Sequence, residues 1–139
     1  MLVQKNGQIF DLPTPAPVPF VYTAQDVNQE RARRLQQDFT FNGVAFQRDT
    51  VSLSRITGAA TLAGFAVGAG AQEGNLRWAN ADQDFAWIAS DNSVVPMDAQ
   101  TCFAFGQAAA AVETTIVFAA KSLRELAPIP DPATWAGWP

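Results

Sequence analysis

The chain has 139 residues, 48% of them hydrophobic and 16% charged, with a formal net charge of −4 at pH 7. These values fit one globular domain with a terminal extension, and the acidic balance excludes nucleic acid as the main partner, because no long-range field draws in a phosphate backbone. With no histidine, one cysteine and one tyrosine, the chain lacks most side chains that perform acid, base, nucleophilic or metal chemistry, so we expect neither an enzyme nor a cofactor.

The first segment predicts a β-hairpin followed by a stiff arm. Asn6-Gly7 lies between Leu2-Val3-Gln4 and Ile9-Phe10, and Asn-Gly between apolar residues is a strong hairpin signal. Four alternating prolines then favour an extended, polyproline-like spacer, and we treat them as candidate partner-binding residues: Pro13, Pro15, Pro17 and Pro19. Either the arm holds a neighbouring subunit or it wraps on its own domain. The first ten residues lack the apolar run of a secretory signal, so we expect synthesis in a cytoplasm.

A polar helix and a second hairpin follow the arm. Thr23 with Asp26 resembles a capping box, and Ala24 to Asp38 predicts a surface helix with a thin apolar side formed by Val27, Leu35 and Phe39. The stretch from Phe39 to Phe46 alternates about Asn42-Gly43, which predicts a hairpin with a two-residue turn.

The middle of the chain predicts a helix and three strands. Thr50 is the expected N-cap of a helix from Val51 to about Ala66, which ends in the glycine-rich stretch from Gly68 to Gly74. Apolar and β-branched residues between turn signals then predict strands at Leu76–Asn80, Phe85–Ser90 and Val94–Met97.

Asp98 is the expected N-cap of one long helix from Ala99 to about Leu126, which Pro128 and the following prolines stop. Its expected apolar stripe consists of Phe103, Gly106, Ala110, Val117, Ala120 and Leu123. The apolar stretches Ile56–Ala71 and Gln107–Ala120 fall short of the ~20 residues that span a bilayer. We therefore expect buried helices and no membrane insertion.

Residues that could carry chemistry have simpler structural interpretations. Gly68-Ala69-Gly70 ends a helix, whereas a phosphate loop would precede one. Asp82, Asp84 and Asp91 lack the spacing of a calcium loop and suit turns. Cys102 has no histidine to activate it, which favours a buried structural thiol. The sequence thus offers no catalytic, cofactor-binding or metal-binding residue.

Two of the four tryptophans, Trp135 and Trp138, lie in the last five residues behind a proline-rich stretch. Large aromatic side chains are costly to leave in water, so they must dock on a surface. That surface is either the chain's own domain or a groove on a partner. We treat both tryptophans as candidate partner-binding residues.

A series of short motifs runs from about Asn28 to Leu126. They are an Arg-rich helix at Glu30–Arg34, the Phe39–Phe46 hairpin, a helix with Ser54–Ala59, Arg77-Trp78 ahead of Trp87, and Ser90–Asp98 before the last helix. In this order they resemble a tail-fibre-associated domain of unknown function encoded in tailed-bacteriophage genomes, commonly beside tail-fibre genes. The resemblance covers about 70% of the chain.

The resemblance implies a structural or adaptor protein of a phage tail, made in the host cytoplasm and located in the virion. Its partners would be tail-fibre or baseplate subunits in a multi-subunit assembly. One alternative is a transient tail-fibre assembly chaperone. Another is a small cell-surface carbohydrate-binding module that uses Trp78, Trp87 or the turn with Asp82 and Asp84.

The predicted fold is α+β, with small antiparallel hairpins packed on two helices and one long C-terminal helix. Residues 1–22 form the N-terminal hairpin and proline-rich arm, residues 23–127 the main domain, and residues 128–139 a Pro/Trp tail. We expect proline-rich arms to extend from both ends.

Overall fold

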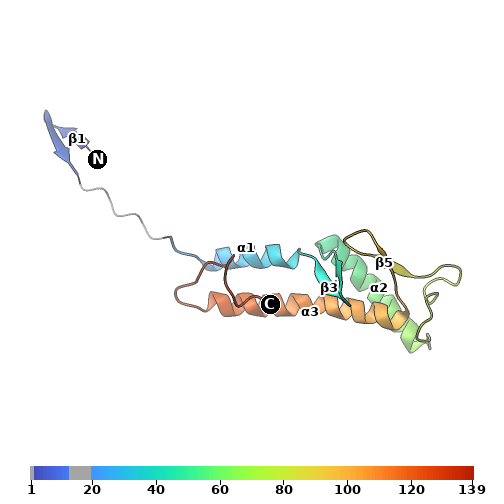
Figure 1. Cartoon of the computed structure of the whole chain (residues 1–139). Coiled ribbons are helices and arrows are strands. Elements are labelled where there is room, and N and C mark those ends of the chain that lie inside the picture. Colours follow the sequence, from blue (N-terminus) through green and yellow to red (C-terminus); the bar gives the residue numbers. More distant parts are fainter. Residues whose placement is uncertain (1, 13–19) are drawn as a thin grey trace.

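The computed structural model describes residues 2–12 and 20–139. Within these ranges the chain forms three α-helices and three two-stranded antiparallel sheets, as expected for the α+β class (Figure 1). The elements are β1 (Leu2–Lys5), β2 (Gln8–Asp11), α1 (Ala24–Leu35), β3 (Phe39–Phe41), β4 (Val44–Phe46), α2 (Thr50–Gly68), β5 (Ala86–Ile88), β6 (Val94–Pro96) and α3 (Ala99–Arg124).

The long helix α3 is the axis on which the other two helices pack. Its N-cap is Asp98, as predicted, and the carboxylate of Asp98 accepts a hydrogen bond of 2.7 Å from the backbone N–H of Thr101. At ~1.5 Å per residue, its 26 residues span about 39 Å. Helix α1 lies along the C-terminal half of α3 and helix α2 along the N-terminal half (Figure 1).

The turns of two hairpins follow directly from their Asn-Gly pairs. Asn42 and Gly43 have φ angles of 49° and 78°, and Asn6 and Gly7 have φ angles of 53° and 76°. Positive φ at both turn residues matches the right-handed twist of the strands, and Asn and Gly adopt it most readily. Both predicted hairpins are confirmed, with Phe39 opposite Phe46 in one and Val3 opposite Phe10 in the other.

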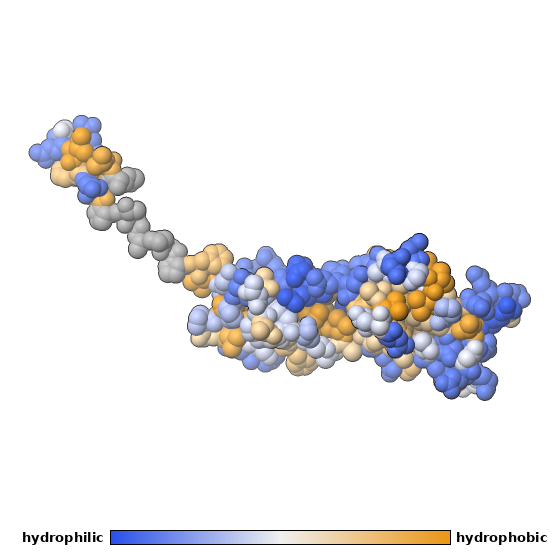
Figure 2. All heavy atoms as spheres, in the orientation of Figure 1, coloured by the Kyte–Doolittle hydropathy of each residue, from blue (hydrophilic) through white to orange (hydrophobic). Residues whose placement is uncertain are grey.

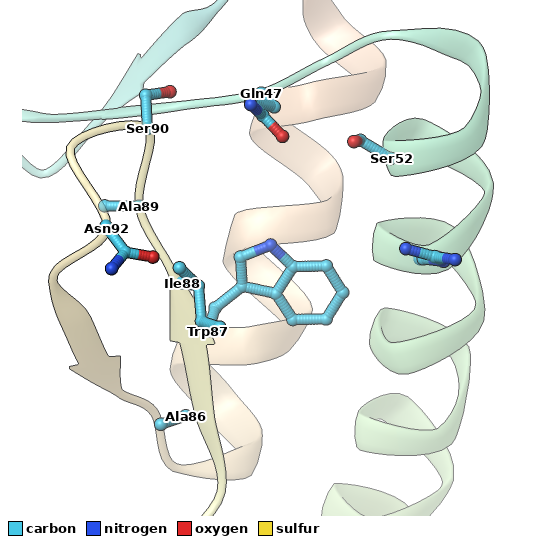
Figure 3. Close-up of a pocket in the computed structure, with 9 residues that line it drawn as sticks. Gln47, Ser52, Ala86, Trp87, Ile88, Ala89, Ser90 and Asn92 are labelled. Atoms are coloured by element: carbon cyan, nitrogen blue, oxygen red, sulfur yellow. The ribbon is translucent and has the colours of Figure 1, made fainter.

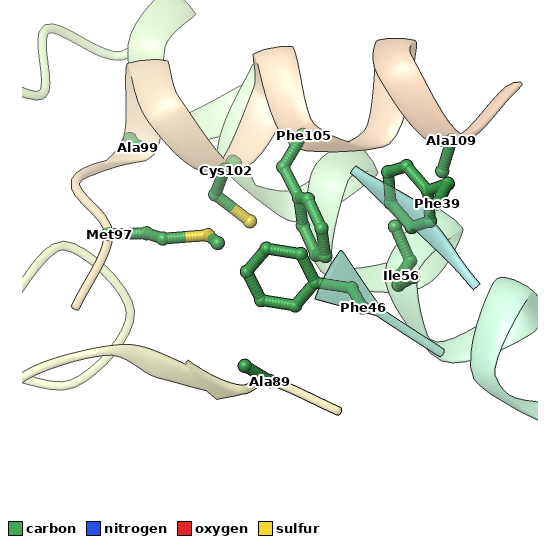
Figure 4. Close-up of a cluster of buried hydrophobic side chains, with 10 residues drawn as sticks. Phe39, Phe46, Ile56, Ala89, Met97, Ala99, Cys102, Phe105 and Ala109 are labelled. Atoms are coloured by element: carbon green, nitrogen blue, oxygen red, sulfur yellow. The ribbon is translucent and has the colours of Figure 1, made fainter. Parts of the chain in front are cut away.

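The main core lies where α2, α3 and the hairpin β3–β4 meet (Figure 4). The ring of Phe105 on α3 is at its centre, with centroids 5.5 Å from Phe39 and 4.7 Å from Phe46. Ile56 of α2 and Met97 are fully buried beside it. The hairpin therefore contributes its alternating phenylalanines to the core, as the sequence pattern indicates.

Arg48 is buried and joins three segments that are distant in the sequence. Its guanidinium donates to the carbonyl oxygens of Ala109 and Leu35, each at 2.8 Å, and its Nη2 lies 3.1 Å from the carboxylate of Glu113. Only 1% of its side chain is exposed, whereas 50% of that of Glu113 is exposed. Arg48 thus fixes the end of α1 against the middle of α3.

Several predicted boundaries are wrong. Residues 76–80 form turns instead of a strand, because the indole Nε1 of Trp78 donates to the carbonyl of Met97 at 3.0 Å and holds this segment as a loop. Asp49, and not Thr50, caps α2: its carboxylate accepts from the backbone N–H of Ser52 at 3.0 Å. Helix α1 ends at Leu35, earlier than expected, which frees Phe39 for β3.

The predicted stripe of α3 is wrong in its N-terminal half. Phe103 and Ala110 are exposed, and the buried positions are Ala99, Cys102, Phe105, Ala109, Ile116, Ala120 and Leu123. Nearly every residue between Cys102 and Val112 is apolar. Because polar and apolar residues do not alternate with the helical period here, the sequence does not indicate which face of the helix is buried.

The expectation that both apolar helices are buried is also wrong. By length and composition alone, α2 and α3 could cross a membrane, but in the described structure only 17% and 22% of their most apolar windows are buried. The core helix of a soluble protein can have the same length and composition. What the structure adds is that much apolar helical surface is uncovered.

Candidate functional site

The predicted partner-binding tryptophans pack against each other and against the body of the protein. Trp135 and Trp138 form a T-shaped pair with centroids 5.6 Å apart, and both cover Val27, Ala120 and Leu123. The indole Nε1 of Trp138 donates to the carbonyl of Pro132 at 2.7 Å. The tail therefore folds back on α1 and α3 and does not extend as an arm.

Arg34 of α1 adds a polar anchor to this tail. Its guanidinium lies 4.8 Å from the centroid of Trp138, within the range of a cation–π contact, and its Nη2 donates to the carbonyl of Ala133 at 3.4 Å. These contacts agree with docking on the chain's own domain, one of the two possibilities that the sequence left open. Partner binding by Trp135 and Trp138 stays a prediction. The other predicted partner-binding residues, Pro13, Pro15, Pro17 and Pro19, lie outside the described residues.

The clearest uncovered apolar surface is a strip along the outer side of α2. Val51, Leu62 and Phe65 are 58%, 65% and 74% exposed. Their spacing, with Gly58 between them, places them on one side of the helix, opposite the buried residues Ile56, Ala60 and Ala63. We call Val51, Gly58, Leu62 and Phe65 the outer α2 strip. Figure 2 shows that apolar side chains interrupt the hydrophilic surface of the body.

A groove of about 530 Å³ lies between α1, β3 and α3. Ala108, Ala111, Val112 and Ile116 of α3 form its apolar wall, and the chain terminus Pro139 borders it. A groove of this size accommodates a few side chains of a partner.

A second hollow, of about 450 Å³, lies between β5 and the start of α2. Figure 3 looks onto the indole ring of Trp87, which lies between β5 and α2 with α3 behind it. Its ring centroid is 5.6 Å from that of Phe105, so one side of the indole packs on the core. Residues with polar side chains, Gln47, Ser52, Arg55, Ser90 and Asn92, surround the other side.

The candidate groups for chemistry are held in structural roles. Burial raises the pKa of the Cys102 thiol to about 11, so the thiol is protonated near neutral pH. Asp84 pairs with Arg77 at 3.2 Å, and hydrogen bonds from Ser93 lower the pKa of Asp91. Among the described residues, no group of three or more His, Cys, Asp or Glu side chains is placed to hold a metal ion.

Sequence reasoning missed the outer α2 strip and the arginine of the Trp87 hollow. Both lie on α2, whose apolar composition favours burial. The sequence does hold a signal for a second apolar face of α2, because successive members of the strip are seven, four and three residues apart. These members are Val51, Gly58, Leu62 and Phe65.

The fold and these surfaces define a small α+β protein with uncovered apolar faces. A family model described as a domain of unknown function (DUF4376) matches residues 23–135. The chain belongs to this family. The match begins at the capping residue of α1 and includes the tail as far as Trp135. No curated protein and no solved structure matches the chain.

Proposed function

We propose that this protein is a structural or adaptor protein of a bacteriophage tail that binds a tail-fibre or baseplate subunit. The observation that carries the proposal is the outer α2 strip, where Leu62 and Phe65 are 65% and 74% exposed. Two large apolar side chains one turn apart on an outer helix face are typical of a surface that another protein covers.

The sequence motifs support the phage assignment. The ordered series from Glu30 to Asp98 resembles a phage-encoded domain that commonly lies beside tail-fibre genes. The low charged fraction of 16% fits a chain whose surface is shared with other subunits. Three separate features offer contacts: the outer α2 strip, the groove beside Pro139, and the Trp135–Trp138 tail.

The test uses particles purified from a phage that encodes this chain. We expect mass spectrometry to find the wild-type protein in the particles and the double variant Leu62→Gln/Phe65→Gln to be lost from them. Because both side chains are exposed, the variant should keep the helical circular dichroism of the wild type. Phe118→Gln, at a 63% exposed position on α3, is the matched control and should be retained.

The remaining outcomes separate the alternatives. Absence of the wild-type protein from particles, with fibres failing to form when its gene is deleted, would favour a transient assembly chaperone. Absence together with normal fibres would overturn both assignments. A separate deletion of residues 133–139 tests the tail: retention of the shortened protein at full stoichiometry would count against partner binding by Trp135 and Trp138.

A further inference from the structure

We propose that the hollow between β5 and the start of α2 binds a sugar residue that carries a carboxylate. This inference goes beyond the proposed structural role and does not depend on it. It rests on three features of the hollow: an aromatic platform, a free cation and several unused hydrogen-bonding groups.

Trp87 is the platform. The indole packs one side against the Phe105 ring, at 5.6 Å and 62° between the planes, and lines the hollow with the rest of its surface. Its Nε1 forms no hydrogen bond within the described residues and lies on the side of the ring nearer Gln47 (Figure 3). An indole held in this way offers a flat apolar surface for the C–H side of a pyranose ring, together with one free donor.

Arg55 supplies the charge. It lies on α2 across the hollow from Trp87 and is the sole charged residue of the lining. The other guanidinium of this region, Arg48, is fully engaged with Ala109, Leu35 and Glu113, whereas Arg55 is exposed and makes no hydrogen bond or ion pair in the described chain. A guanidinium without a partner matches a carboxylate through two parallel hydrogen bonds.

The remaining groups fit hydroxyls. The side chains of Gln47 and Asn92 line the hollow and form no hydrogen bond among the described residues. The hydroxyl of Ser52 donates to Asp49 at 2.7 Å and keeps its lone pairs for a ligand donor.

The size and polarity of the hollow favour a sugar over an apolar peptide anchor. Its volume of about 450 Å³ is at the small end of ligand sites, which run from roughly 300 to 1,000 Å³. Its lining combines one aromatic ring with amide, hydroxyl and guanidinium groups. Such a lining offers many hydrogen bonds to a sugar, whereas an apolar peptide side chain would leave these groups without partners.

The experiment titrates the full chain with a trisaccharide of galacturonic acid and follows the indole N–H signal of Trp87 by NMR, assigned with the Trp87→Phe variant. We expect a saturable shift, and a much weaker one with the matching neutral trisaccharide of galactose. Arg55→Ala should weaken binding of the acidic sugar at least about ten-fold, because a charge-assisted hydrogen-bonded pair is lost. Arg55→Lys should restore part of it, since the charge returns without the planar fork.

Arg31→Ala is the matched control, because it removes the same charge from α1 at a position that does not line the hollow. The inference is overturned if the acidic trisaccharide does not move the Trp87 signal, or if the neutral trisaccharide moves it as strongly. It is also overturned if acetate alone reproduces the shift, or if Arg31→Ala weakens binding as much as Arg55→Ala. Arg55 is exposed, so its substitution tests the site without disturbing the core.

Discussion

At the residue scale, Arg48 is the clearest structural determinant outside the apolar core. Its side chain is 1% exposed, and its guanidinium donates hydrogen bonds to the carbonyl oxygens of Leu35 in α1 and Ala109 in α3. Glu113, its charged partner, stays half in water. The arginine is therefore held mainly by backbone acceptors, and the ion pair contributes less.

Arg48→Met should lower the free energy of unfolding by about 2–4 kcal/mol, because it removes a buried group with three hydrogen bonds, one of them to the carbonyl of Leu35 at the end of α1. Glu113→Gln should cost less than about 1 kcal/mol, since solvent screens a half-exposed pair. Urea unfolding followed by circular dichroism measures both. Equal losses in the two variants would show that the ion pair, and not the backbone contacts, carries the stability.

The sequence could not predict this role. Arg48 stands between a hairpin and a helix, where an arginine is usually solvated, and its partner Glu113 is 65 residues away. By contrast, Asp98 was recognised as a cap, because its partner Thr101 is three residues away. Hydrogen bonds from Thr101 and Gly74 hold the pKa of Asp98 below its usual value. Short-range polar contacts can be inferred from sequence, whereas long-range ones depend on the fold.

At the element scale, small residues set the distance between α2 and α3. A Cβ atom added at Gly106 would lie 2.2 Å from the Cβ of Ala60, and one added at Gly64 would lie 3.3 Å from the ring of Phe103. Gly106 is thus required by a close helix approach. Gly58 of α2 has open space around it.

Gly106→Ala should lower the free energy of unfolding by about 1–3 kcal/mol despite its gain in helix propensity, because the helices must separate. Gly58→Ala is the matched control. It should raise the free energy of unfolding by about 0.5–1 kcal/mol, because alanine favours the helix and the added Cβ meets no neighbour. Thermal unfolding of both variants measures the difference. The double variant Gly106→Ala/Ala60→Gly should recover part of the lost stability, because it removes the Cβ that the new alanine would meet. If stability does not recover, contact with Ala60 is not the cause of the loss.

The Asn-Gly turns and the Asp98 cap of α3 were predictable at this scale, whereas the cap of α2 and the buried faces of the helices were not. Asn6-Gly7 and Asn42-Gly43 specify their hairpins within two residues. In α3, however, Phe103 and Phe105 are equally apolar, and only the fold shows that Phe105 is buried and Phe103 exposed. For the candidate site, the sequence offers Trp87 as a sugar contact, but only the packing of β5 beside α2 shows that Arg55 lines the same hollow.

At the scale of the whole molecule, α3 connects two separate packing clusters. In the first cluster, Phe105 of α3 packs with residues of α2 and the hairpin β3–β4. In the second cluster, Leu123 of α3 packs with Val27 of α1 and the two tryptophans of the tail. Among the described residues, the second cluster has three fully buried members, and Trp135 and Trp138 pack over it. This end of the molecule should therefore open more easily than the other.

Trp138→Ala tests this dependence. It removes the indole that covers the α1–α3 cluster and contacts Arg34. Amide hydrogen exchange should become at least about ten-fold faster in α1 and in the last turns of α3, a loss of ~1.4 kcal/mol of local stability. Amides around Phe105 should keep their protection. Phe118→Ala, which removes a 63% exposed aromatic side chain from the same half of α3, should change neither region. Equal acceleration throughout the protein would mean that the two clusters unfold as one unit.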